Sequence, residues 1–83
     1  MNETLSLETS SDRSPVTKAL RLLAHVARRK EAVTLADLSR TLGLPKPTAY
    51  RLAAALEATG FLERELIGRR YRIGSTFEEV ALS

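Results

Sequence analysis

The stretch 35–53 (LADLSRTLGLPKPTAYRLA) constrains the fold more than any other part of the chain. It begins with apolar residues spaced to lie on one face of a helix, at about residues 35–42. Gly43 comes next, and glycine commonly ends a helix because it adopts a positive φ without strain. Pro45 and Pro47 then mark a helix start, since proline fits only the edge or the first turn of a helix. The spacing predicts a helix-turn-helix.

The second helix of this motif, expected over residues 46–59, presents a polar face. Its apolar residues, Ala49, Leu52 and Leu56, lie together on the side that faces the core. The opposite side carries hydrogen-bond donors suited to base edges and phosphates: Lys46, Thr48, Tyr50 and Arg51. An ordinary helical hairpin is the alternative, and this donor-rich face favours a helix that enters the DNA major groove.

Positive charge gathers on the segments that would face a polyanion. The net charge is +3, but residues 13–51 contain nine basic and two acidic residues. The segments 1–12 and 75–83 are acidic. A solvated basic surface is the ordinary alternative, and the clustering favours a nucleic-acid partner.

The first helix should begin at Ser14-Pro15, with Ser14 as N-cap, and run to about Arg29. We expect a polar row that leaves His25 solvated, and Leu22 at the edge of the buried stripe, where it could serve a dimer contact. The buried stripe itself should consist of Val16, Ala19, Leu20, Leu23, Val26 and Ala27.

Two further elements frame the motif. Residues 32–34 are short and β-branched, so they predict a single-bridge strand, after which Thr34 caps the next helix and could hold a phosphate. Residues 61–73 alternate around Gly68 and predict a two-stranded hairpin, the wing of a winged helix, with Arg69 near its tip. An ordinary surface hairpin is the alternative.

The two ends of the chain read differently. Residues 1–13 are polar and lack periodicity, so we expect a flexible arm. Residues 75–83 open with Ser75 and Glu78 in capping-box spacing, which predicts the start of a longer helix. The domain proper should therefore be 14–74.

Composition excludes several classes of function. The chain contains no cysteine, one histidine and no glycine-rich phosphate loop, so neither an enzyme, a metal site nor a cofactor is expected. The sequence shows no signal peptide and no apolar run of membrane-spanning length, which favours a cytoplasmic protein. Aromatic residues make up 5% of the chain, which offers little for stacking on RNA bases.

Three segments together resemble the N-terminal domain of the IclR family of bacterial transcription regulators: SPVTKALRLLAHV, TLADLSRTLGLPKPTAYRLAAALEATGFLER and GRRYRIG. The resemblance covers roughly residues 13–83. It implies a winged helix that binds operator DNA as a homodimer, and a small-molecule effector domain, reached through a linker helix near Ser75, that these residues do not include. Pro47 departs from the serine more usual there, which removes a hydroxyl and a backbone donor.

The sequence thus predicts a mainly α fold with a small β-hairpin, a winged helix-turn-helix that binds specific double-stranded DNA as part of a repressor or activator. Tyr50 and Arg51 should read base edges, and Lys46 and Thr48 should contact bases or phosphates. The remaining cations and Thr34 should hold the DNA backbone and set the register. The full set of expected DNA-binding residues is Thr34, Arg40, Lys46, Pro47, Thr48, Tyr50, Arg51, Arg69 and Arg70. The alternative is a protein-interaction module on the same scaffold, whose exposed helix face would be apolar or acidic.

Overall fold

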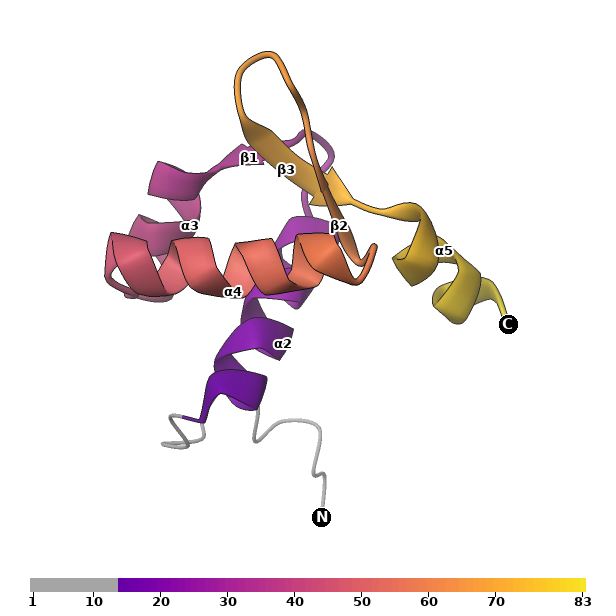
Figure 1. Ribbon diagram of the computed structural model, residues 1–83, viewed down its shortest axis with the longest axis horizontal. Coiled ribbons are helices and arrows are strands. Elements are labelled where there is room, and N and C mark those ends of the chain that lie inside the picture. Colours follow the sequence, from indigo (N-terminus) through magenta and orange to yellow (C-terminus); the bar gives the residue numbers. More distant parts are fainter. Residues whose placement is uncertain (1–13) are drawn as a thin grey trace.

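The computed structural model describes residues 14–83, and the predicted arm of residues 1–13 lies outside them. The helices pack against a small antiparallel sheet in a winged helix-turn-helix, as the sequence predicts (Figure 1). The elements in chain order are α2 (Pro15–Ala27), β1 (Val33–Thr34), α3 (Leu35–Leu42), α4 (Lys46–Ala58), β2 (Leu62–Arg64), β3 (Arg70–Ile73) and α5 (Ser75–Leu82). No helix in this described part is long and apolar enough to cross a membrane.

The hydrophobic core lies where α2, α3, α4 and the sheet meet. Its largest fully buried side chains are Leu22, Leu38 and Leu62, one each from α2, α3 and β2. Ala53 of α4 and Tyr71 of β3 complete the contact between the helices and the sheet. Each element therefore contributes an apolar face to a single shared core.

The expected buried stripe of α2 is partly wrong. Leu22 is fully buried in the core, so it does not lie at an edge, whereas Val16 and Leu20 are exposed. The reason is that the later half of α2 packs between α3, α4 and β3, while its first turns project past α4 (Figure 1). The helix also ends at Ala27, two residues earlier than expected, with Arg28 as its C-cap.

The caps of α2 and α3 are those that the sequence predicts. Ser14 Oγ accepts a hydrogen bond from the N–H of Thr17, and Thr34 Oγ1 accepts one from the N–H of Asp37, at 3.2 and 3.1 Å. Gly43 ends α3 at φ 67°, in the left-handed region that favours glycine. Past Gly43, the N–H of Leu44 donates to the carbonyl of Ser39 at 3.0 Å, which closes the turn before α4.

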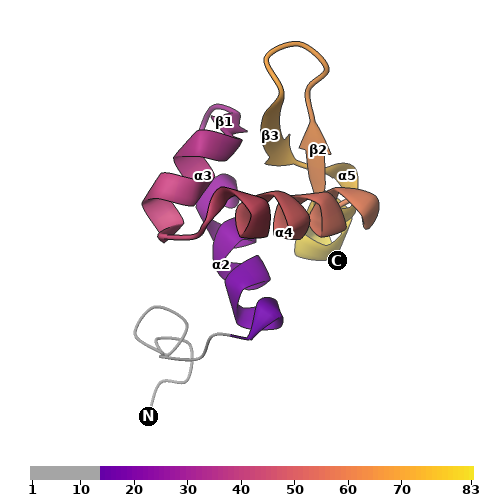
Figure 2. The ribbon, with the colours of Figure 1, turned by 60° about the vertical axis from the view of Figure 1, so that its left-hand side comes forward.

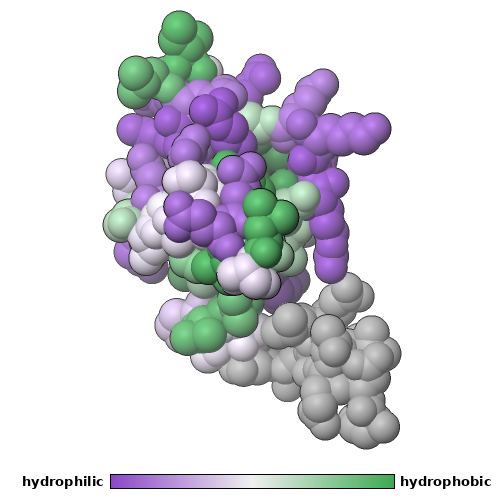
Figure 3. Space-filling view, turned by 90° about the vertical axis from the view of Figure 1, so that its right-hand side faces the viewer, coloured by the Kyte–Doolittle hydropathy of each residue, from purple (hydrophilic) through white to green (hydrophobic). Residues whose placement is uncertain are grey.

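The strands form one sheet in the order β1-β3-β2. Val33 pairs with Tyr71 and Thr34 with Arg70, so the short segment before α3 becomes an edge strand beside the hairpin. The hairpin then projects beyond α4 as a wing (Figure 2). Its tip forms an apolar knob at the top of the space-filling view (Figure 3).

The predicted capping box at the start of α5 is wrong. The helix begins at Ser75 itself, with Gly74 as N-cap and no side-chain capping bond. The cause is a backbone crossing: Gly74 N–H donates to the Phe61 carbonyl at 2.9 Å, and Thr76 N–H donates to the Gly60 carbonyl at 3.1 Å. These bonds, and an edge-to-face contact between Phe61 and Phe77, tie α5 to the end of α4.

The crossing at Gly74 predicts a sensitive position. Gly74 has an ordinary φ of −93°, but an added Cβ would overlap the carbonyl oxygen of Gly60 and lie 3.1 Å from the carbonyl carbon of Leu62. We expect Gly74→Ala to lower the free energy of unfolding by about 1–3 kcal/mol, since backbone atoms cannot yield as a flexible side chain would. Urea denaturation followed by circular dichroism measures the change.

The neighbouring variant Ser75→Ala is the control, because the Ser75 side chain is exposed and forms no capping bond. It should change stability by less than about 0.5 kcal/mol. Equal effects of the two substitutions would contradict the role of the backbone crossing.

Candidate nucleic-acid interface

The helix α4 separates an alanine face from a donor face. Ala49 and Ala53 are fully buried against the core. Because alanine is small, α4 packs closely against the core at these positions. The residues on the opposite side of α4 do not contribute to the core and can contact a ligand. That opposite side carries the predicted residues: Lys46, Pro47, Tyr50 and Arg51 are exposed, and Thr48 is half-buried.

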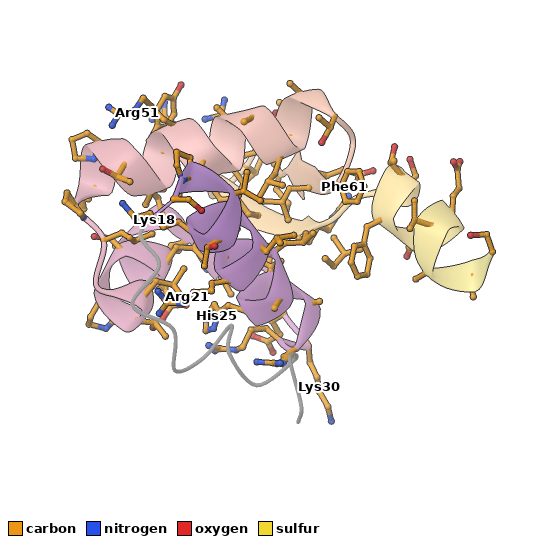
Figure 4. The ribbon with its side chains drawn as sticks, turned by 90° about the horizontal axis from the view of Figure 1, so that it is seen from below. Lys18, Arg21, His25, Lys30, Arg51 and Phe61 are labelled. Atoms are coloured by element: carbon orange, nitrogen blue, oxygen red, sulfur yellow. The ribbon has the colours of Figure 1, made fainter. Side chains whose placement is uncertain are left out.

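The donor face has two sides with different neighbours. Thr48 and Arg51 line a shallow hollow together with Lys18 of α2. Figure 4 shows Arg51 pointing outward from α4, away from the body of the domain. Tyr50 lies on the other side, toward the wing, where it is among the groups that act on the buried Tyr71. A ligand lying along α4 would therefore meet α2 on one side and the wing on the other.

Tyr71 joins the wing to α4. Burial raises the pKa of its phenol, while the neighbouring Arg64 acts to lower it and the carboxylate of Glu57 acts to raise it. Arg64 belongs to β2 and Glu57 to α4. The base of the wing therefore lies directly beside α4.

The arginines of the wing differ in their partners. Arg72 is held by Glu63 and Glu65, with nitrogen–oxygen distances of 3.3 and 3.2 Å. Arg69 and Arg70 are exposed and form no ion pair within residues 14–83. Arg69 has a φ of 51°, directly after Gly68 at 85°, so the backbone turns sharply at the tip. The two predicted wing residues, like the exposed Arg64 of β2, thus have no ionic partner in this part of the chain.

The structure brings Thr34 and Arg70 together, although they are distant in sequence, because they pair across β1 and β3. Thr34 is exposed at the start of α3, where backbone N–H groups favour an anion. Its hydroxyl oxygen accepts the capping bond, which leaves the hydroxyl hydrogen available for donation. The β1–β3 pairing therefore puts a hydroxyl donor and a cationic residue at neighbouring positions of the sheet.

The predicted solvation of His25 is wrong, and Arg40 has an ion-pair partner within its own helix. His25 is not solvated: its side chain is 16% exposed, and Nε2 lies 3.3 Å from Asp37 Oδ2. Arg40 lies 2.9 Å from the other oxygen of Asp37, and Arg29 lies 3.7 Å from Oδ2. This Asp37 cluster ties the end of α2 to α3. Asp37 and Arg40 have the three-residue spacing of a helical pair, but no sequence signal indicates that His25 and Arg29 approach them.

The Asp37 cluster predicts a pH dependence of stability. The hydrogen bond from His25, aided by the charges of Arg29 and Arg40, holds the pKa of Asp37 below its ordinary value of 3.8, although burial opposes this. A carboxyl whose pKa is lower in the folded state stabilises the fold above its unfolded pKa and loses this effect as pH falls through the folded pKa. Asp37→Asn should therefore lower Tm at neutral pH, and its difference from the unmodified chain should shrink in acid.

Thermal unfolding followed across the acidic range measures this difference. Glu79→Gln is the matched control, because Glu79 is exposed on α5 and forms no ion pair within the described residues. It should follow the unmodified chain at every pH. An Asp37→Asn deficit that is constant down to strong acid would contradict the ionic origin.

Lys18 is the residue that sequence reasoning missed at this interface. Helical periodicity puts it only on the polar side of the first helix, whereas the structure places it beside Thr48 and Arg51. Figure 4 shows it on α2, below α4 in that view. The crossing of α2 over α4 brings it there, and no local sequence signal gives that crossing.

Comparisons with known proteins agree with this geometry. The family model of the IclR helix-turn-helix domain matches residues 15–66. The chain is 45% identical over 56 residues to the glycerol operon regulatory protein of Streptomyces griseus, covering 68% of this chain and 21% of that protein. It is 36% identical over 64 residues to the HTH-type transcriptional regulator KipR of Bacillus subtilis (strain 168), covering 77% and 25%.

A solved structure shows the same fold. The crystal structure of an IclR transcriptional regulator from Alicyclobacillus acidocaldarius superposes with a TM-score of 0.77 at 29% identity, over 82% of this chain and 28% of that one. The chain spans about a fifth to a quarter of the length of the two curated relatives. The matched family model covers more than half of the chain, so this chain belongs to the IclR helix-turn-helix family.

Proposed function

We propose that this chain binds specific double-stranded DNA and serves as the operator-reading part of a transcriptional regulator. The observation that carries the proposal is the face of α4: alanines are buried on one side, and hydrogen-bond donors are exposed on the other. A helix of this kind fits the major groove, where base pairs are distinguishable. The relatives named above are regulators of transcription, which supports a binding domain rather than an enzyme.

In this proposal, Tyr50 and Arg51 contact base edges. Arg51 is the residue best suited to guanine, because a guanidinium can bond both O6 and N7. Lys46 and Thr48, near the start of α4, contact bases or phosphates. Pro47 lies on the same exposed turn, where it offers van der Waals contact but no donor.

Phosphate contacts fix the orientation of the domain on the duplex. Thr34 and Arg70, which pair across β1 and β3, contact phosphates of one DNA strand. Arg69 contacts the DNA backbone from the wing. Arg40 has 75% of its side chain exposed, so it can contact a phosphate while it keeps its bond to Asp37. Lys18 adds a cation beside Arg51.

Replacing Arg69 with alanine should weaken binding to all sequences alike. The logarithm of the binding constant falls linearly with the logarithm of the salt concentration. The loss of one phosphate contact makes this slope less steep by about 0.9. Titrations of one selected and one scrambled duplex at several salt concentrations measure both effects. A slope equal to that of the unmodified chain would contradict the phosphate contact.

We propose further that the regulator acts as a homodimer, with residues 75–83 as the start of a linker helix toward an effector-binding domain. An apolar hollow between α2 and α5, lined by Leu20, Leu23 and Phe77, supports a contact with a second copy. Two copies would place their α4 helices about one turn of DNA apart. Because operator DNA in bacteria is cytoplasmic, the proposal places the regulator there.

Selection of bound duplexes from a random pool tests the proposed function. The expected product is an enriched site with two-fold symmetry and a steep dependence of affinity on salt. Binding without any sequence preference, even at low salt, would overturn specific operator reading. An enriched site without symmetry would overturn the dimer alone.

A further inference from the structure

The tip of the wing carries two large apolar side chains that pack on nothing within residues 14–83. Leu66 is 94% exposed and Ile67 is 90% exposed, the highest values among the exposed large apolar residues. Neither belongs to the hydrophobic core or to the residues packed against it. Single exposed apolar residues are ordinary, but an adjacent pair at the end of a projecting hairpin is a surface for contact.

The turn itself does not require these residues. The sharp bend is made by Gly68 and Arg69, which have positive φ, and it is closed by a 2.8 Å bond from Glu65 N–H to the Arg70 carbonyl. Polar residues such as Asn, Asp or Ser are the usual choice at exposed turn positions. Folding therefore does not explain why Leu66 and Ile67 are apolar.

The charges around the tip indicate its partner. Arg69 and Arg70 flank the apolar pair on one side, and Arg64 is exposed on β2. The nearby carboxylates of Glu63 and Glu65 are both paired with Arg72, which reduces their repulsion of an anion. An apolar tip between cations complements the DNA minor groove, where phosphates border deoxyribose walls and base edges.

The position of the wing relative to α4 also favours the DNA minor groove as the partner of the tip. The base of the hairpin packs against α4, beside Tyr50 and Glu57. Leu66 begins the turn of the hairpin, two residues past the end of β2. With α4 in the major groove, the tip would therefore lie over the adjacent minor groove.

We propose that Leu66 and Ile67 form an apolar wedge that enters this minor groove and partly unstacks one base step, so that the operator bends. The inference rests on the proposed function and names a second contact of the same interface. A B-DNA minor groove is about 6 Å wide, too narrow for a hairpin with its side chains, so entry of the wedge widens it. Flexible pyrimidine–purine steps should be favoured at this point, although no donor reads them.

The test compares Leu66→Ser/Ile67→Ser with the unmodified 83-residue chain on the selected duplex. The duplex carries 2-aminopurine at successive steps and a pair of dyes at its ends, so that unstacking and bending are both read at saturating protein. The unmodified chain should brighten one step outside the α4 contacts and shorten the dye distance. The double variant should lose both signals and bind about tenfold more weakly, while its salt slope stays unchanged because no charge is removed.

Leu82→Ser is the matched control, since Leu82 is 86% exposed at the far end of α5. It should behave as the unmodified chain. A double variant that bends and unstacks the duplex normally would overturn the wedge while leaving operator binding intact. Normal bending by the double variant, together with lost binding to anionic vesicles, would assign the tip to a membrane surface instead. If the unmodified chain bound no duplex at all, the proposed function would fail and the wedge with it.

Discussion

Replacing Leu38 with alanine should lower the free energy of unfolding by about 3–4 kcal/mol. Leu38 is fully buried where α3 meets the core, in one cluster with buried residues of α2, α4 and the sheet. Truncation removes the transfer free energy of the lost methyl groups and leaves a cavity that rigid helices cannot close. A domain of this size has a free energy of unfolding of about 5 kcal/mol, so the variant should lose most of its stability.

Urea denaturation followed by circular dichroism measures this loss. Leu82→Ala is the matched control, because it truncates the same side chain at an exposed site. It should change stability by less than about 0.5 kcal/mol. A Leu38→Ala variant within that same small range would show that the core does not lie where the structure places it.

Replacing Arg51 with alanine should weaken binding to the selected operator by about ten- to a hundredfold, or about 1–3 kcal/mol. Arg51 points outward from the middle of the donor face of α4, and its loss removes a bidentate contact with a base (Figure 4). The variant should also tolerate any base pair at one position of each half-site. Repeating the duplex selection with the variant shows whether that one position becomes random.

Lys30→Ala is the control for Arg51→Ala, since it removes one positive charge from outside α4, far from Arg51 in Figure 4. It should lower affinity little and leave the selected sequence unchanged. If Arg51→Ala weakens all duplexes alike and keeps every base preference, then Arg51 contacts a phosphate instead of a base.

Most of the fold could be predicted because its signals are local. Gly43 ends α3, Ser14 and Thr34 cap α2 and α3, and the alternation around Gly68 marks the hairpin. Each of these depends on residues within a few positions of one another. Local hydrogen bonds and backbone preferences therefore sufficed.

The errors lie where distant segments meet. Leu22 is buried because α2 contacts α3 and α4 as well as β3. The apolar periodicity of α2 alone does not show how many elements cover it. His25 meets Asp37 only through the packing of α2 on α3. Gly74, not Ser75, caps α5 because its backbone crosses that of Gly60.

The proposed interface divides in the same way. The donor face of α4 follows from helical periodicity alone, so Tyr50 and Arg51 could be chosen from sequence. The pairing of Thr34 with Arg70 requires the β1–β3 register, and the approach of Lys18 requires the crossing of α2 over α4. Neither follows from sequence spacing.

Methylation interference on the selected operator tests most directly the claim that α4 reads bases in the major groove. Methylation at guanine N7 blocks an acceptor in that groove, whereas methylation at adenine N3 lies in the minor groove. We predict that N7 methylation of at least one guanine in each half-site prevents binding, and that Arg51→Ala removes the effect at one of them. Half-sites in which no guanine N7 interferes would contradict the placement of α4 in the major groove.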